Sequence, residues 1–217
     1  MKIALIGATG FVGSALLEEL LQRGHQVTAL ARNPAKLAAR DGLTVLSADV
    51  YDAAQVAQAV EGQDAVLSAF NPGWTDPALY ERFTAGHRAI VAGSKRAQAK
   101  RLLVIGGAGS LYVAPGVQLV DTPSFTEHVP PHIVPGAQAA RDALTELRQD
   151  NTLNWTLVSP PAMLQPGQRT GAYRLGQEQL LMNGEQPAGI SVQDFAVAVV
   201  DELESPKHLR QRFTVAN

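Results

Sequence analysis

Short apolar runs separated by helix-like stretches fill the first half of the chain. Five of them predict strands, at Lys2–Ile6, Gln26–Ala31, Leu43–Ser47, Asp64–Ala69 and Leu102–Ile105, the first of them buried. Apolar side chains occupy both alternating positions of these runs, which is typical of strands that are covered on both faces. We therefore expect a sheet that is buried between two layers of helices.

The stretches between these runs have the spacing of amphipathic helices. In the first stretch, apolar residues recur three and four positions apart, and Gly24 follows as a C-terminal cap. The predicted helices are Phe11–Arg23, Pro34–Arg40, Asp52–Val60 and one long helix between Asp76 and Gln98. Strands that alternate with such helices pair in parallel through right-handed crossovers. The pattern predicts an α/β fold with a Rossmann-like, doubly wound parallel sheet and helices on both faces.

Two segments of the second half, residues 107–136 and 161–190, are too rich in proline and glycine for long regular elements. A loop of that length inside a compact domain is usually functional or disordered. The regular patterns around these segments are helix Ala137–Gln149, strand Trp155–Val158, helix Ser191–Leu203 and strand Arg212–Val215. No change in composition divides the chain, so we expect residues 1–217 to form one domain. The two segments would build a small C-terminal cap on its substrate side.

The composition narrows the classes of partner. A net charge of −2 creates no basic field for nucleic acid or an anionic membrane, and the absence of cysteine removes disulfides and thiolate chemistry. No apolar run approaches the roughly 18 residues that a membrane helix needs. No spacing of His, Asp and Glu indicates a metal site. We expect a cytoplasmic protein with a small-molecule partner, as a monomer or a homodimer.

Three glycines, Gly7, Gly10 and Gly13, stand where the first strand leads into the first helix. Gly7 permits a tight turn, Gly10 lets the backbone approach a ligand, and Gly13 lets the helix pack closely on the strand. The helix start at Phe11 and Val12 offers unpaired N–H groups and a partial positive charge to a pyrophosphate. The alternative is a merely glycine-rich turn. The position between a strand and a helix, at the head of a repeated α/β pattern, favours a dinucleotide.

The residue after the second strand indicates which dinucleotide. A carboxylate there would bind the ribose hydroxyls of NAD, but the chain has Arg32 at this point. A guanidinium can hold the 2′-phosphate of NADP and stack on adenine, so NADPH is favoured over NADH. The alternative is an ordinary solvated arginine at a helix start. Lys36 and Arg40 add positive charge nearby but fit a solvated helix face better.

The other strand ends complete the expected cofactor site. Ligands of open α/β sheets lie outside the carboxyl ends of the strands. The residues expected to contact the cofactor there are Asp49 and Val50 after the third strand, Ala69, Phe70 and Asn71 after the fourth, Gly106, Gly107 and Ala108 after the fifth, and Pro160 and Met163 after the sixth. The last two groups would lie beside the nicotinamide and its ribose.

The segments GATGFVG at 7–13, ARNPAKL at 31–37 and ADV at 48–50 resemble motifs of the atypical short-chain dehydrogenase/reductase superfamily. Within it, the chain is similar to the NmrA-like and biliverdin reductase B/flavin reductase-like group. GGAGSL at 106–111 and SPPAML at 159–164 resemble bacterial proteins labelled as candidate NADH-flavin reductases. The resemblance covers essentially the whole chain. It implies that Thr9, the turn glycines, Arg32 and the Asp49–Val50 pair contact NADP.

The chain departs from the superfamily at the catalytic pair, Tyr-x-x-x-Lys. None of its tyrosines, Tyr51, Tyr80, Tyr112 and Tyr173, has a lysine four residues on, and Gly107 stands where a serine is usual. Alcohol–ketone chemistry needs a proton donor beside the carbonyl oxygen. A flavin or quinone accepts hydride into a conjugated ring and can take its proton from water. We therefore expect NADPH-dependent hydride transfer to a flavin (FMN or FAD), a quinone or a similar acceptor. The alternative is a non-catalytic, redox-sensing regulator that binds NADP.

Candidate residues on the substrate side fall in the irregular segments. Tyr112 could stack on a planar acceptor, and His128 or His132 could donate a proton near neutral pH. The plainer interpretation of the two histidines is that both are surface residues in a loop. Arg169, Tyr173 and Arg174 could hold an anionic group or simply face water, and nothing in the sequence decides between the two.

Overall fold

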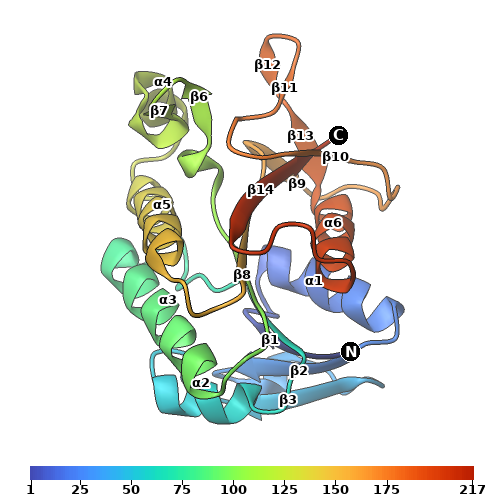
Figure 1. The fold of residues 1–217 in the computed structure, drawn as a ribbon. Coiled ribbons are helices and arrows are strands. Elements are labelled where there is room, and N and C mark those ends of the chain that lie inside the picture. Colours follow the sequence, from blue (N-terminus) through green and yellow to red (C-terminus); the bar gives the residue numbers. More distant parts are fainter.

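The computed structural model describes residues 1–217 and contains one large sheet (Figure 1). Its eight strands lie in the order β10-β14-β8-β5-β4-β1-β2-β3, and all neighbours are parallel except β10 and β14. The strands are β1 Lys2–Ile6, β2 Gln26–Ala31, β3 Leu43–Ser47, β4 Ala65–Ser68, β5 Leu102–Ile105, β8 Trp155–Ser159, β10 Arg174–Gly176 and β14 Gln211–Ala216. This order, which runs outward in both directions from β1 and β4, confirms the doubly wound sheet.

Helices cover both faces of the sheet, as predicted, except at the edge strand β3, whose residues are half-buried or exposed (Figure 1). On one face α1 (Phe11–Gln22) packs beside α6 (Val192–Glu204), and on the other α3 (Leu79–Arg96) lies between α2 (Ala53–Val60) and α5 (Val134–Gln149). Two large clusters of buried apolar residues form the core, one on each side of the sheet. No helix is both long enough and apolar enough to cross a membrane.

Capping residues set several helix boundaries. The Asp52 carboxylate accepts hydrogen bonds from the first N–H groups of α2, and Ser191 Oγ accepts one from the Asp194 N–H at the start of α6. Gly24 adopts a φ of +76° just after α1, which is the left-handed conformation expected of a C-terminal cap.

Two predicted helices are corrected. The segment Pro34–Arg40 contains only a single 3₁₀ turn, Pro34–Lys36, because Leu37 returns to an extended conformation. Helix α5 begins at Val134, before the predicted Ala137. Proline is tolerated in a first helical turn, where its missing N–H costs no hydrogen bond, so Pro135 belongs to the helix.

The two proline- and glycine-rich segments contain short elements and lie at the same end of the sheet (Figure 1). The first holds the hairpin β6 (Tyr112–Ala114) and β7 (Val117–Gln118), helix α4 (Pro123–His128) and 3₁₀ turns at Ala108–Ser110 and Leu119–Asp121. The second holds β9 Met163–Gln165, β10, β11 Met182–Asn183 and β12 Gln186–Pro187, and β13 Gly189–Ser191 ends next to α6. The second segment is therefore more than a cap, because β10 pairs with β14 and becomes the edge of the main sheet.

Candidate functional site

The glycine turn between β1 and α1 is closed by backbone contacts. Gly7 has a φ of +86°, and a Cβ placed on it would lie 2.4 Å from the Ala69 carbonyl oxygen. A Cβ on Gly13 would lie 1.9 Å from the Gly7 oxygen. A Cβ on Gly10 would meet only that oxygen, at 3.3 Å. Gly7 and Gly13 are thus required by the fold itself, whereas Gly10 borders open space at the helix start.

The first turn of α1 offers free hydrogen-bond donors at this point. The N–H groups of Phe11 and Val12 donate to no other protein group, and no side chain caps the helix at Gly10. Unpaired N–H groups at a helix N-terminus, together with the helix dipole, form an anion-binding position. A diphosphate therefore fits this turn both sterically and electrostatically.

A groove of about 360 Å³ runs from this turn across the carboxyl ends of β1 and β2. It is lined by Ile6, Gly7, Thr9, Leu30, Ala31, Arg32, Asn33, Lys36, Val50, Phe70 and Asn71. Six predicted cofactor residues thus share one groove: Gly7, Thr9, Arg32, Val50, Phe70 and Asn71. The sequence reasoning missed Asn33 as a lining residue and placed Lys36 on a solvated face. Their place directly after β2 was the available signal.

The cations near the groove differ in their partners. Arg32 and Lys36 line the groove, and neither side chain makes a hydrogen bond or an ion pair within the protein. Arg40, by contrast, pairs with the Glu18 carboxylate and lies outside the groove. Two unpaired positive charges therefore stand together at the end of the groove that follows β2.

The residues after β3 and β4 form the opposite wall. Val50 is buried in this wall, and the rings of Tyr51 and Phe70 meet edge to face with their centroids 5.8 Å apart. Asp49 is exposed and does not line the groove. Its carboxylate accepts a hydrogen bond from the Tyr51 N–H at 3.0 Å. Asp49 thus shapes the local turn. Ala69 lies just behind the wall and contributes its carbonyl to the packing of Gly7.

The remaining predicted cofactor residues lie beyond the groove lining, on the turns after β1, β5 and β8. They are Gly10, Phe11, Val12, Gly106, Gly107, Ala108, Pro160 and Met163. Phe11 and Met163 expose about half of their surface, 49% and 53%. Both are large apolar side chains without a covering partner at the carboxyl edge of the sheet.

The α5 side chains in contact with Gly107 and Gly109 are small. A Cβ on Gly107 would lie 3.4 Å from the Ala140 methyl group, and a Cβ on Gly109 would lie 3.4 Å from that of Ala137. Gly136 lies against the ring of Trp74, which is half-exposed above it. Neither a hydroxyl nor an ammonium group of α5 stands at these contacts.

Ser110 is buried beneath the turn that follows β5. It is 1% exposed, its hydroxyl donates to the Gly107 carbonyl at 3.3 Å, and it accepts a hydrogen bond from Arg212. A buried hydroxyl with two internal partners is a structural group. The serine three residues after Gly107 therefore does not replace the usual catalytic serine.

The three substrate-side candidates are not brought together. Tyr112 lines a separate open cavity of about 660 Å³ between the β6–β7 hairpin and the segment around Glu178. His128 is exposed at the end of α4, where its Nδ1 lies 2.8 Å from the Ser124 carbonyl, and His132 is exposed in the following loop. Neither histidine lines the groove or the Tyr112 cavity.

The three polar residues of the second segment are bound within the protein. Arg169 makes two hydrogen bonds to the buried Glu19 carboxylate, and Tyr173 donates to Asp201. Arg174 donates to the Asn217 and Met182 carbonyls. The Arg169 hydrogen bonds lower the pKa of Glu19 despite its burial. Arg169 and Tyr173 therefore hold the segment on α1 and α6, and Arg174 joins it to Asn217, which follows β14.

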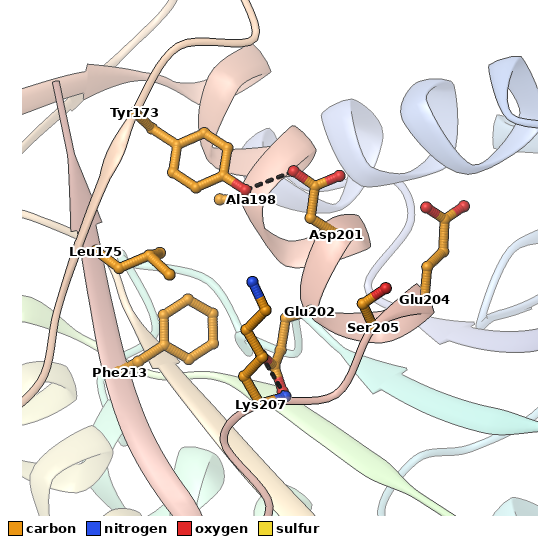
Figure 2. A pocket seen from close by; sticks show the side chains of 9 residues that line it. All are labelled: Tyr173, Leu175, Ala198, Asp201, Glu202, Glu204, Ser205, Lys207 and Phe213. Atoms are coloured by element: carbon orange, nitrogen blue, oxygen red, sulfur yellow. Dashed lines mark hydrogen bonds between the residues drawn. The ribbon is translucent and has the colours of Figure 1, made fainter.

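Figure 2 shows a further cavity, of about 260 Å³, at the C-terminal end of α6. Tyr173, Phe213 and Lys207 line it together with carboxylates of α6. The carboxylates are already paired with Arg23, Arg101, His25 and His208. No group of three or more His, Asp or Glu side chains could hold a metal ion. The groove, and not this cavity, adjoins the glycine turn.

The doubly wound sheet with a groove at its glycine turn defines a Rossmann-type nucleotide-binding protein. Comparison with known families agrees. The profile of an NAD(P)H-binding family matches residues 7–206, so the chain belongs to that family. The resemblance to the atypical short-chain dehydrogenase/reductase, NmrA-like group is confirmed.

Similar proteins span the whole chain. YwnB of Bacillus subtilis, described as uncharacterised, is 39% identical to this chain. The alignment covers 100% of this chain and 99% of YwnB. A candidate epimerase from Bacteroides thetaiotaomicron has a solved structure that is 43% identical, with a TM-score of 0.90 over 99% of this chain and 96% of its own. The structure of a candidate NADH-flavin reductase from Streptococcus pneumoniae is 34% identical, with a TM-score of 0.83 over 100% of this chain and 99% of its own. A candidate exported protein from Burkholderia pseudomallei is 42% identical, with a TM-score of 0.88 over 100% of both chains.

Proposed function

We propose that the protein is an NADPH-dependent reductase that transfers hydride to a flavin, a quinone or a similar conjugated acceptor. One observation carries the proposal. A groove that begins at the glycine turn has two unpaired cations at one end, while the α5 side chains that contact the turn after β5, Ala137 and Ala140, offer no proton donor.

The end of the groove after β2 supports NADPH over NADH. Arg32 and Lys36 have no partners of their own, so a 2′-phosphate would meet two positive charges without first breaking an ion pair. Val50 and the Tyr51–Phe70 pair would enclose the adenine side. The diphosphate would accept hydrogen bonds from the Phe11 and Val12 N–H groups.

The nicotinamide end would lie between the turns after β5 and β8. Bound NADPH supplies the hydride there, and the chain contributes orientation and shelter from water. Ala140 beside Gly107 and Ala137 beside Gly109 offer no proton. This arrangement suits an acceptor whose ring takes up hydride and draws its proton from solvent. It does not suit an epimerase or alcohol dehydrogenase, which need a positioned acid or base.

The test is steady-state oxidation of NADPH with FMN, FAD and a water-soluble quinone, with NADH run in parallel. We expect turnover with at least one acceptor and a lower KM for NADPH than for NADH. Gly10→Val is the comparison variant, because its side chain would enter the diphosphate position, and its Cβ would meet no protein atom other than the Gly7 oxygen, at 3.3 Å. Turnover of this variant at the wild-type rate would contradict the proposed cofactor position.

The second candidate function is a non-catalytic regulator that senses the NADP redox state, and the alanine face of α5 favours it equally. The two functions separate in the same experiment. Tight binding of NADPH with no oxidation by any acceptor would reject the reductase and support the regulator. A location in the cytoplasm and a monomeric or homodimeric state stay predictions.

A further inference from the structure

A buried arginine on β14 joins three distant segments. The Arg212 side chain is 0% exposed. It donates hydrogen bonds to Ser110 Oγ and Ser159 Oγ, each 3.3 Å away, and to both the carbonyl, at 3.1 Å, and the carboxylate of Glu178. These partners belong to the turn after β5, to the end of β8 and to the second cap segment.

The two serines adjoin the turns that would border the nicotinamide. Ser110 ends the 3₁₀ turn that begins at Ala108, and its hydroxyl donates to the Gly107 carbonyl at 3.3 Å. Ser159 is the last residue of β8 and directly precedes Pro160. Any displacement of the Arg212 guanidinium would therefore be passed to both turns through these hydroxyls.

Stability alone does not explain an arginine at this position. Arg212 Nε and the neighbouring Thr214 Oγ1 are buried without a hydrogen-bond partner. Burial raises the pKa of Glu178, but hydrogen bonds from Arg212 and Arg148 outweigh it and lower the pKa. A well-packed apolar side chain is often at least as stabilising as such a buried ion pair. What the guanidinium adds is several directed hydrogen bonds in one rigid plane.

We propose that Arg212 is a positioning residue, which holds the turns after β5 and β8 in the geometry that hydride transfer requires. The inference rests on the proposed function, because only that function puts the reacting ring between these turns. Arg212 touches neither the cofactor groove nor open solvent. Small displacements at a reacting centre reduce the rate far more than they reduce binding. Loss of Arg212 should therefore lower kcat and spare NADPH affinity.

Arg101 provides a matched control. It is also a buried arginine paired with a carboxylate, Glu202 at 2.6 Å. It directly precedes β5, however, and so lies at the amino ends of the parallel strands, away from the turns after β5 and β8. Both arginines can be replaced by methionine without leaving a carboxylate alone. Glu178 keeps Arg148, and Glu202 keeps His208.

For Arg212→Met we expect kcat for NADPH oxidation to fall roughly 10- to 100-fold while the Kd for NADPH changes by less than about twofold. For Arg101→Met we expect both quantities to stay within about twofold of wild type, whatever the loss of thermal stability. Equal kcat losses in the two variants, or a loss of NADPH affinity as large as the loss of kcat, would overturn the proposal.

A second set of variants tests the same proposal if Arg212→Met does not fold. The double variant Ser110→Ala/Ser159→Ala removes the two hydroxyl acceptors and leaves the Arg212–Glu178 pair in place. Thr156→Ala is its control, since this buried hydroxyl accepts a hydrogen bond from Arg101 at the amino ends of the strands. The serine double variant should reproduce the kcat loss, and the threonine variant should not. The opposite result contradicts the positioning role.

A failure of the proposed reductase function can be told apart from a failure of the role of Arg212. Wild-type protein that binds NADPH but reduces no acceptor would reject that proposal alone. The fluorescence of bound NADPH then reports the nicotinamide environment directly. We expect Arg212→Met, and not Arg101→Met, to shift its intensity or emission maximum. An unchanged spectrum in Arg212→Met would overturn the role of Arg212.

Discussion

At the scale of single residues, the partners of a charged side chain decide its role. Arg40 is bound to Glu18 and Arg169 to Glu19, so both stabilise the packing of neighbouring segments. Arg32 has no partner within the protein and lines the groove. Residue type is identical in the three cases, and only the surroundings separate an arginine that is free to bind a ligand from one that is held by a carboxylate of the protein.

Arg32→Ala should weaken NADPH binding by at least roughly tenfold and change NADH binding by less than about twofold, because a charge-assisted phosphate contact contributes about 1.5–3 kcal/mol. Fluorescence titration with the two nucleotides measures both effects. Arg40→Ala is the matched control, since it removes a nearby arginine from outside the groove. Equal losses for NADPH and NADH in Arg32→Ala would refute contact with the 2′-phosphate.

At the scale of elements, the first turn of α6 is hydrogen-bonded to the segment 161–190. Ser191 Oγ accepts a hydrogen bond from the Asp194 N–H at 3.0 Å and donates one to the Gln168 carbonyl at 2.8 Å. The Asp194 carboxylate in turn accepts from the N–H groups of Thr170 and Gly171. The start of the helix therefore also anchors the loop that runs back across it.

Ser191→Ala should lower the free energy of unfolding by about 1 kcal/mol, the usual contribution of an N-terminal cap. Urea denaturation followed by circular dichroism measures the loss. Ser191→Asp keeps an acceptor at this position and should recover most of the stability. Limited proteolysis should cut the alanine variant faster around Gln168, and unchanged cleavage would show that the loop is held independently of the cap.

At the scale of the whole molecule, the packing of α3 on α5 buries an ionisable group. His87 on α3 is 4% exposed, and burial lowers its pKa to about 4, with opposite smaller effects from Glu146 and Arg88. The unfolded chain binds a proton at the ordinary histidine pKa of about 6.5, whereas the folded protein does not until near pH 4. Stability contributed by the neutral imidazole is therefore present above pH ~6.5 and is lost as the pH falls toward 4.

Replacing His87 by methionine should make stability less dependent on pH. The stability of the wild type relative to His87→Met should fall by up to about 1.4 kcal/mol per pH unit between pH 6 and 4.5. Urea denaturation at several pH values measures this slope. His128→Gln is the control, because His128 is exposed, and its slope should match wild type. Parallel slopes for wild type and His87→Met would show that His87 is not the titrating group.

Much of the main sheet and its helices could be predicted from local pattern, because strands such as β1 and β5 are continuous apolar runs and Asp52 and Ser191 are capping residues. The predictions that were wrong involve weak local signals. Pro34–Arg40 has a helix start but no buried face to sustain a helix. Pro135 suggests the interruption of a helix in the sequence, although proline fits the first turn of α5. The joining of β10 to the main sheet depends on pairing with β14, which no local signal announces.

The sequence by itself determined the glycine turn, the alternation of strands and helices and the identity of the residue after β2, because these depend on neighbours along the chain. Only the tertiary structure decided which side chains are free to act. It bound Arg169, Tyr173 and Ser110 to internal partners and left Lys36 open. The physical reason is that a polar side chain is satisfied by whatever group folding brings beside it, and that group is usually distant in sequence.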